Sequence, residues 1–337
     1  MLRQLATRPL ARHGHMMAAA LHVRTKTTTS APVPGLDLST EKLRRTVFYV
    51  PCSEERKLQK ALSSDADCIM YDLEDGVSLN RKTQARSQVL SALASNTHSK
   101  ERGVRINAIG SGLELDDLQT VLQSPTLDVI LVPKAETAKD IHVVSHLVDR
   151  LAPAETRQRI KIIAGIESAL GIMNIREIAQ CDPRVDALLF AAEDYCADTG
   201  ITRTPARTEL LYPRAAVATA AAAFKKQAID MVCMDFRDMK VLGDECSEGA
   251  QMGFSGKQVI HPAQVATVQE RFLPPDEIVL RAWRIVQGYQ TNYALGKGAF
   301  DLDGKAIDMP VVKWAYKILR RMELAGVDVE AKFRQAA

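Results

Sequence analysis

Lys161-Ile-Ile-Ala-Gly-Ile-Glu167 and Ala187-Leu-Leu-Phe-Ala-Ala-Glu193-Asp194 are two apolar segments that each end on a carboxylate, with a helix-like segment between them. Continuous apolar runs of this length are typical of buried parallel strands. In α/β folds, the carboxyl ends of such strands carry the chemistry. Two hard oxygen ligands on neighbouring strands suit Mg²⁺, whose other octahedral positions stay with water and substrate. The structural alternative is that Asp194 or Ser168 caps the following helix and Glu167 pairs with a basic residue.

Eight such runs follow one another along the chain, with helical patterns between them. They are Val47–Pro51, Cys68–Leu73, Val104–Asn107, Asp128–Pro133, Ile162–Glu167, Ala187–Ala192, Ala228–Met234 and Lys257–His261. A doubly wound sheet would normally show a glycine-rich phosphate turn after its first strand, and Tyr49-Val-Pro-Cys-Ser53 is not such a turn. The number and alternation of the runs therefore predict an α/β protein with a (β/α)₈ TIM barrel over residues 44–275.

The chain beyond the barrel, residues 276–337, is expected to form C-terminal helices and a lid. Helical patterns cover Glu277–Tyr293 and Val311–Leu324, and a small hairpin is expected around Asp303-Gly304 between them. A glycine-bearing segment outside a barrel is either a surface excursion or a lid over an active site.

Residues 1–36 have a composition of their own. They hold five Lys or Arg residues, three His residues and no Asp or Glu, and Thr25–Ser30 is nearly all hydroxyl residues. This composition is typical of a mitochondrial transit peptide, and the alternative is a disordered basic tail without a targeting role. We therefore expect a mitochondrial matrix protein.

Composition narrows the function further. The net charge is +3 and no basic stripe is interleaved with aromatic residues, so nucleic-acid binding is not expected. No run of 18 apolar residues occurs, so no membrane span is expected. The six cysteines are scattered without a Cys-x-x-Cys pair, which fits core positions in a reducing compartment and gives no zinc spacing.

Polar and charged residues lie at the carboxyl ends of the expected strands and should converge on one mouth of the barrel. They are Asp72, Glu74, Asp75, Arg105, Asn107, Lys134, Glu136, Glu167, Asp194 and His261. Such a mouth offers a metal site and a basic anchor for a substrate carboxylate. It offers no nucleophilic Ser or Cys with a paired His.

Several of these residues also have structural explanations. Arg105 could simply neutralise Glu74 or Asp75, and His261, which precedes a proline, could be a turn residue. Lys134 could form a Schiff base with a carbonyl substrate if its pKa were lowered, or it could pair with a neighbouring acid.

Eight motifs, in order from about Arg44 to Met309, resemble those of the citrate lyase β-subunit-like branch of the HpcH/HpaI aldolase superfamily. They are Phe48-Tyr-Val-Pro51, Asp72-Leu-Glu-Asp-Gly-Val77, Val104-Arg-Ile-Asn107, Val132-Pro-Lys-Ala-Glu136, Gly165-Ile-Glu-Ser-Ala-Leu-Gly171, Glu193-Asp194-Tyr195, Gly256-Lys-Gln-Val-Ile-His-Pro262 and Ile307-Asp-Met-Pro310.

The resemblance implies a role for each matching residue. Glu167 and Asp194 would bind Mg²⁺, and the catalytic residues would be Arg105, which holds the oxo-acid carboxylate, Glu74, and Asp308, the acid/base on the lid. Residues implied to bind substrate or CoA are Tyr49, Arg56, Lys60, Asp75, Arg105, Ile260 and His261. Arg56 stands where close relatives have Lys, and Cys52-Ser53 replaces the more usual Gly-Asn. Arg and Lys are not equivalent at a phosphate, so these two departures weaken the expected phosphate contacts.

The resemblance also implies a function. A homo-oligomer, usually a trimer, would use Mg²⁺ to cleave a 3-hydroxyacyl-CoA such as citramalyl-CoA to acetyl-CoA and a 2-oxo acid, pyruvate, with a reverse Claisen-type activity possible. The alternatives are a Schiff-base aldolase that uses Lys134, and a non-catalytic or complex-dependent subunit of the citrate lyase type. Discrimination among citramalyl-, malyl- and methylmalyl-CoA depends on pocket shape around one or two methyl groups, which the sequence does not specify.

Overall fold

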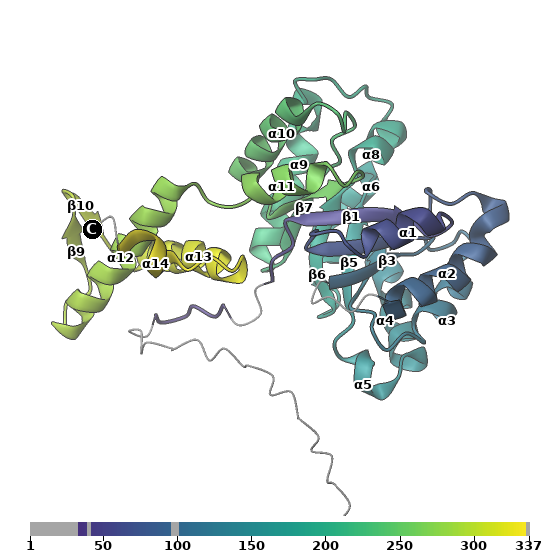
Figure 1. Cartoon of the computed structure of the whole chain (residues 1–337), viewed down its shortest axis with the longest axis horizontal. Helices are drawn as coiled ribbons and strands as arrows, with labels where there is room; N and C mark the ends of the chain where they lie inside the picture. The colour runs from purple at the N-terminus through teal and green to yellow at the C-terminus, as the bar shows by residue number, and fades with distance from the viewer. Residues whose placement is uncertain (1–32, 39–41, 96–100, 335–337) are drawn as a thin grey trace, which may run out of the picture.

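The eight apolar runs form eight parallel strands that close into one barrel, as the sequence predicts (Figure 1). The computed structural model describes residues 33–38, 42–95 and 101–334, so the expected transit peptide lies almost wholly outside the described residues. The strands are β1 (Thr46–Pro51), β2 (Cys68–Asp72), β3 (Glu101–Arg105), β4 (Val129–Val132), β5 (Lys161–Ile166), β6 (Val185–Phe190), β7 (Gln227–Asp230) and β8 (Gly256–Val259). They pair in sequence order, and β8 closes the barrel against β1.

Helices cover the outside of the barrel, so that each strand is followed by at least one helix. They are α1 (Glu55–Ala61), α2 (Lys82–Ser95), α3 (Glu114–Val121), α4 (Ala138–Leu151), α5 (Ala154–Arg157), α6 (Ala169–Met173), α7 (Ile175–Gln180), α8 (Ala192–Thr199), α9 (Leu211–Ala223), α10 (Met239–Met252) and α11 (Gln264–Arg271). Local sequence fixes several ends: Thr137 and Asp140 make a capping box at the start of α4, and Gly253 ends α10 in a left-handed conformation.

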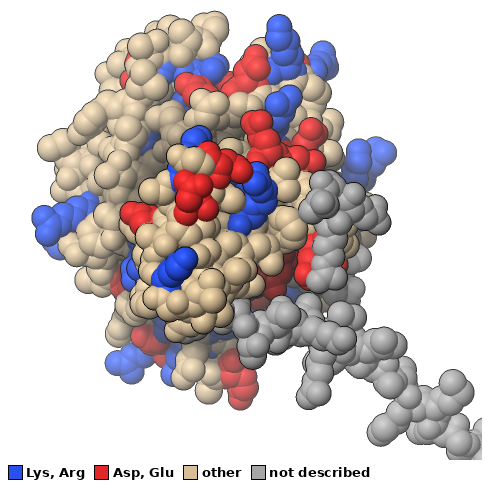
Figure 2. All heavy atoms as spheres, turned by 90° about the vertical axis from the view of Figure 1, so that its left-hand side faces the viewer, with Lys and Arg blue, Asp and Glu red and all other residues tan. Residues whose placement is uncertain are grey.

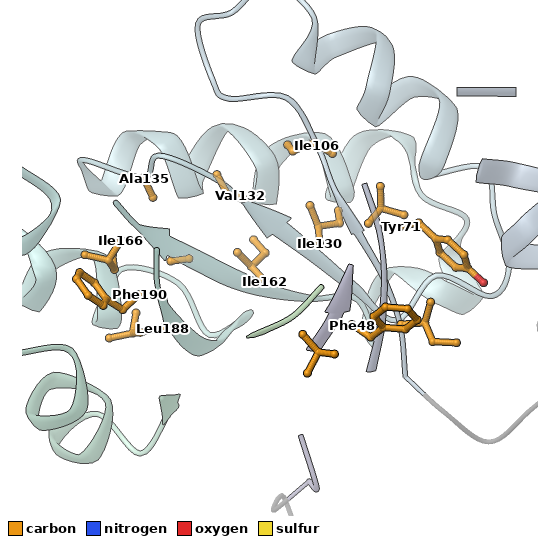
Figure 3. Packing of buried hydrophobic residues seen from close by; sticks show 14 of the residues in the cluster. Phe48, Tyr71, Ile106, Ile130, Val132, Ala135, Ile162, Ile166, Leu188 and Phe190 are labelled. Carbon is orange, nitrogen blue, oxygen red and sulfur yellow. The ribbon is translucent and has the colours of Figure 1, made fainter. Parts of the chain in front are cut away.

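The strands are buried on both faces, which explains their continuous apolar runs. Side chains that point inward, such as Met70, Leu131 and Leu189, fill the barrel interior. Side chains that point outward pack against the helices and form the larger core, of which Phe48, Tyr71 and other members are drawn in Figure 3. The barrel interior is therefore a packed core, and only its mouth is open for chemistry.

The C-terminal segment forms a helical arm that projects to one side of the barrel in Figure 1. It contains α12 (Asp276–Ala294), α13 (Met309–Leu324) and α14 (Val329–Arg334), with the hairpin β9 (Phe300–Leu302) and β10 (Lys305–Ile307) turning at Asp303-Gly304 as expected. The arm has an apolar core of its own between α12, α13 and the hairpin. Among the described residues, no helix is long and apolar enough to cross a membrane.

Arg44, just before β1, ties together the amino ends of distant strands. Its guanidinium is fully buried and contacts Glu101 at 2.6 Å, Asp186 at 3.1 Å and the side-chain oxygen of Gln227 at 2.8 Å. Those three residues lie at the beginnings of β3, β6 and β7. The backbone is equally tight there, because a Cβ on Gly256 would lie 2.0 Å from the Arg44 carbonyl oxygen. Arg44 therefore closes the bottom of the barrel.

We predict that Glu101→Gln lowers the free energy of unfolding by about 3 kcal/mol at pH 7. Burial alone would raise the pKa of Glu101, but the charges and hydrogen bonds of Arg44 and Lys42 outweigh it and hold the pKa at about 2, against an ordinary value of 4.5. A lowered pKa stabilises the folded state above the unfolded pKa, and this contribution is lost as the pH falls toward 2. The difference in free energy of unfolding between wild type and variant should therefore become smaller below about pH 4.5.

Urea unfolding at a series of pH values measures this difference. Glu155→Gln, an exposed residue on α5, removes the same charge and should leave stability unchanged. Equal stability of Glu101→Gln and wild type at pH 7 would contradict the prediction.

Candidate active site

Asp72 and Arg105 form the base of the mouth. They are register partners at the ends of β2 and β3, and both Asp72 oxygens accept from Arg105, at 2.7 Å each. Asp72 also accepts the backbone N–H groups of Glu74 and Gly76, at 2.9 and 3.0 Å. The Arg105 guanidinium lies 4.9 Å from the centre of the Tyr49 ring. Asp72 therefore fixes both the arginine and the loop that carries Glu74.

Glu74 is buried between two cations. Arg105 Nη1 lies 2.9 Å from one of its carboxylate oxygens, and Lys134 Nζ lies 2.6 Å from the other. The ion pair considered for Arg105 thus exists with Glu74, and it is extended by Asp72. Burial raises the pKa of Glu74, although the charge of Arg105 and the hydrogen bond and charge of Lys134 oppose that rise.

Lys134 reaches three carboxylates from the turn after β4. Its ammonium contacts Asp75 at 3.2 Å and Asp194 at 3.5 Å in addition to Glu74. Its backbone is left-handed, with φ of 49°, which is uncommon for a residue with a side chain. Strained backbone of this kind persists where the surrounding structure requires it, often at functional sites. The acid pairing considered for Lys134 is therefore present.

Glu167 is a buried carboxylate with one unsatisfied oxygen. It follows β5, its exposed fraction is 3%, and no hydrogen bond from any described residue reaches Oε2. Burial, reinforced by the charges of Glu74 and Asp194, raises the pKa of Glu167 to about 8. The backbone at Gly165 leaves room for this side chain, since a Cβ there would lie 2.5 Å from Glu167 Oε1. An orphaned, buried carboxylate oxygen is costly without a positive partner.

Asp194 lies in the first turn of α8, directly after β6. The helix starts without a side-chain cap, so Asp194 does not serve as one. Ser168, by contrast, does cap α6 by accepting the Gly171 N–H at 3.1 Å. The neighbouring Glu193 points away to pair with Arg203. Half-exposed Asp194 thus keeps its carboxylate available to the mouth, with Lys134 beside it.

The donor set of the mouth fits a hard divalent cation. Among the described residues, no three His, Cys, Asp or Glu side chains gather around a common point. The two carboxylates of Glu167 and Asp194 would hold the ion, and a charge of +2 would satisfy the orphaned Glu167 oxygen. Mg²⁺ is commonly bound by one or two carboxylates together with water and substrate oxygens.

The residues implied to bind substrate or CoA lie at different depths. Tyr49 points into the top of the barrel interior, where its hydroxyl donates to Gln258 at 3.1 Å, so it forms the floor of the mouth. Arg56 and Lys60 are exposed on α1. Ile260 is 39% exposed, and His261 stacks on Phe236 with ring centroids 4.8 Å apart. The ring nitrogen of His261 accepts the Ala263 N–H in one tautomer, which is the turn role considered for it.

Asp308 lies on the arm, at the start of α13. Its Oδ1 accepts the Val311 N–H at 3.4 Å, so the carboxylate caps the helix in this conformation. Figure 2 looks at the arm side of the molecule and shows acidic and basic side chains interspersed on that face. Within one chain the arm projects from the barrel in Figure 1, and the lid role of Asp308 stays a prediction.

Lys82 supports the mouth and was not singled out in the sequence. Its buried ammonium donates to the carbonyls of Leu73 and Glu74 at 2.7 and 2.8 Å, and to Asn107 Oδ1 at 2.6 Å. Asn107 in turn donates to Asp117 at 2.6 Å. Lys82 is the first residue of a helix, and no sequence signal distinguishes it from an ordinary exposed helix lysine.

Comparison with known proteins places these features in a family. A model of the HpcH/HpaI aldolase/citrate lyase family matches residues 45–262. The chain is 37% identical to the mitochondrial citramalyl-CoA lyase of Homo sapiens, over 92% of this chain and 96% of that protein. It is 33% identical to the citrate lyase subunit beta of Escherichia coli strain K12, over 86% of this chain and 96% of the subunit.

A solved structure adds to these sequence matches. The protein CitE from Mycobacterium tuberculosis, in complex with magnesium, acetoacetate and coenzyme A, superposes with a TM-score of 0.68 and 29% identity. The match covers 83% of this chain and 98% of that one. The closed barrel, its motifs and these matches lead to one conclusion: the chain belongs to the HpcH/HpaI aldolase/citrate lyase family.

Proposed function

We propose that the protein is a Mg²⁺-dependent carbon–carbon lyase that cleaves citramalyl-CoA, a 3-hydroxyacyl-CoA thioester, to acetyl-CoA and pyruvate. The observation that carries the proposal is the buried carboxylate oxygen of Glu167 that has no hydrogen-bond partner, in a mouth that also holds Asp194 and Arg105. The names of the relatives supply the substrate class: citramalyl-CoA lyase for the human protein, and magnesium with coenzyme A for the M. tuberculosis complex.

Glu167 and Asp194 would hold the metal. Bound there, Mg²⁺ supplies a Lewis acid for the hydroxyl and carboxylate oxygens of the substrate. Arg105 would bind the same carboxylate: it uses at most three of its five N–H groups on Asp72 and Glu74, which leaves two for substrate. Its position over Tyr49 and its ties to Asp72 hold the guanidinium plane in one orientation, which suits bidentate recognition.

The bond that breaks joins the hydroxyl-bearing carbon to the CH₂ group next to the thioester. The hydroxyl proton goes to a carboxylate of the mouth, and Glu74 is the candidate because burial raises its pKa. The electron pair of the broken bond moves to the CH₂ carbon, giving the enolate of acetyl-CoA and leaving pyruvate. Asp308 would then give this carbon a proton, which completes acetyl-CoA, and exchange with solvent would take the proton from Glu74 and return one to Asp308. In the reverse direction Asp308 would remove the proton from acetyl-CoA.

A Schiff-base aldolase is disfavoured by the state of Lys134. Burial alone would lower the pKa of Lys134, but the hydrogen bond and charge of Glu74, with the charges of Glu167 and Asp194, raise it above its ordinary value. A protonated ammonium is not a nucleophile, so carbonyl addition is blocked. Borohydride with pyruvate should therefore fail to trap the protein, whereas EDTA should abolish turnover.

The proposal extends to assembly and location. The arm projects from its own barrel, so Asp308 reaches a mouth by movement of the arm or by closing over a second copy, and we propose a homotrimer. The acid-free, Arg-bearing residues 1–36 and the mitochondrial relatives together support import into mitochondria. A subunit that works only within a larger complex is the alternative, since the E. coli relative is named a citrate lyase subunit, and activity of the isolated chain on free citramalyl-CoA would argue against it.

We predict that Glu167→Ala and Asp194→Ala each abolish acetyl-CoA release from citramalyl-CoA and lose Mg²⁺ binding while remaining folded. The reason is that each removes one of the two proposed protein ligands. Acetyl-CoA release from a panel of 3-hydroxyacyl-CoA thioesters, with and without Mg²⁺, measures the first effect, and calorimetric titration with Mg²⁺ measures the second. Glu193→Ala removes a neighbouring carboxylate that faces Arg203 and should keep its metal. Near-normal turnover of either ligand variant at low Mg²⁺ would show that the residue is not a ligand.

Asp308→Asn is expected to bind CoA substrate nearly normally but to lose about 10²–10⁴-fold in turnover, the usual size of a general acid–base contribution. The amide keeps the helix cap and removes the acid. Steady-state kinetics separates the two effects as kcat and KM. Mixing Asp308→Asn subunits with Glu167→Ala subunits tests where the acid acts: restored activity indicates a site shared between chains, and no restoration indicates closure within one chain.

Removal of residues 1–36 should leave an active enzyme that no longer enters mitochondria. Isolated mitochondria incubated with the full and shortened chains measure import, and the lyase assay measures activity. An inactive shortened chain would show that this segment contributes to the fold.

A further inference from the structure

Lys134 carries the only ammonium among the described residues that contacts Glu74, Asp75 and Asp194 together. Its Nζ lies 2.6, 3.2 and 3.5 Å from their oxygens, in that order. The left-handed turn after β4 directs this side chain across the mouth. One of the three carboxylates, Asp194, is a proposed metal ligand, so the ammonium and the metal would share it.

Glu74 is the carboxylate that could become a third ligand of the proposed metal. The Lys134 ammonium contacts Glu74 at 2.6 Å and the proposed ligand Asp194 at 3.5 Å, so Glu74 lies close to the proposed metal position. Even so, Glu74, Glu167 and Asp194 do not form a metal-ligand group in the described part of the chain. Lys134 donates a hydrogen bond to one oxygen of Glu74, and Arg105 forms an ion pair with the other at 2.9 Å.

We propose that Lys134 is a positioning residue that withholds Glu74 from the metal and thereby keeps coordination positions open for substrate. The proposal rests on the proposed metal site at Glu167 and Asp194. With Glu74 engaged, the protein gives the ion only two carboxylates, and water or the two substrate oxygens fill the remaining positions. A third carboxylate would bind the ion more tightly and occupy a position that the substrate needs.

Loss of the ammonium should therefore tighten metal binding. Lys134→Met removes one positive charge from the neighbourhood of the ion and frees one oxygen of Glu74 to approach it. Both changes act in the same direction, and we expect Mg²⁺ and Mn²⁺ to bind on the order of tenfold more tightly. Turnover should fall and KM should rise, because the substrate must then displace a protein carboxylate. A side chain with a merely structural role would weaken metal binding or leave it unchanged.

The experiment measures metal binding and hydration separately from activity. Mn²⁺ binding to the full chain is followed by electron paramagnetic resonance, and water-proton relaxation counts the exchangeable waters on the bound ion. Lys134→Met should bind more tightly with fewer waters, and Lys134→Gln, a polar neutral substitute, should do the same. Lys134→Arg keeps the charge and should bind like wild type. Lys139→Met, an exposed lysine on α4, matches the change in net charge and should also bind like wild type.

A double substitution tests the part played by Glu74. In Lys134→Met/Glu74→Gln the freed carboxylate is gone, so affinity and water count should return toward wild type, a non-additivity that a double-mutant cycle measures. Unchanged or weaker binding by both folded neutral variants would overturn the proposal. So would a double variant that binds as tightly as Lys134→Met alone.

The ligand variant separates this proposal from the proposed function. If Glu167→Ala binds Mn²⁺ as wild type does, or if wild type binds none, the proposed metal site is overturned. The proposed role of Lys134, which depends on that site, is then overturned as well. If Glu167→Ala loses Mn²⁺ while the neutral Lys134 variants bind no more tightly than wild type, the metal site stands and only the role of Lys134 is overturned.

Discussion

The bidentate pair between Asp72 and Arg105 is the contact from which the mouth is organised. It joins two register partners on neighbouring strands, so its geometry follows from the barrel itself. Asp72 sets the loop that carries Glu74, Arg105 holds Glu74, and Glu74 in turn holds Lys134, which reaches Asp194. Removal of one partner of a buried ion pair costs about 3–5 kcal/mol, because the other charge is left unpaired. The register of β2 and β3 thus determines, through this series of contacts, where the charged groups lie across the mouth.

Sequence reasoning reached the barrel because a buried parallel strand leaves a readable pattern. All eight expected runs overlap observed strands, and the hairpin at Asp303-Gly304 lies where a turn residue pair predicts it. The site was harder, since its partners are far apart in sequence. Nothing near Lys134 distinguishes a Schiff-base lysine from one that pairs with Glu74, sixty residues away. Lys82 and Arg44 were missed for the same reason: their importance comes from burial and from long-range partners, which periodicity does not report.

The molecule divides its roles between the barrel and the arm. The barrel has an inner and an outer apolar core and places strained backbone and buried charge at its mouth, where Lys134 and Glu167 lie. The arm packs α12 and α13 around a separate apolar core, so Asp308 is carried by a segment with its own packing. An acid on such a segment could change its distance from the proposed metal site without disturbing the barrel, which suits the proposed role of Asp308 as a proton donor after the carbon–carbon bond has broken.

Arg44 has a consequence for how the chain folds during synthesis. It leaves the ribosome before any strand, yet Asp186 and Gln227 emerge only after more than half of the chain has been made, and β1 finds its second neighbour only when β8 appears. Pairing between such distant segments makes folding slow and leaves strand edges exposed in the meantime. The nascent barrel therefore keeps an open edge until β8 emerges, and Arg44 can pair only with Glu101 until β6 and β7 have been made.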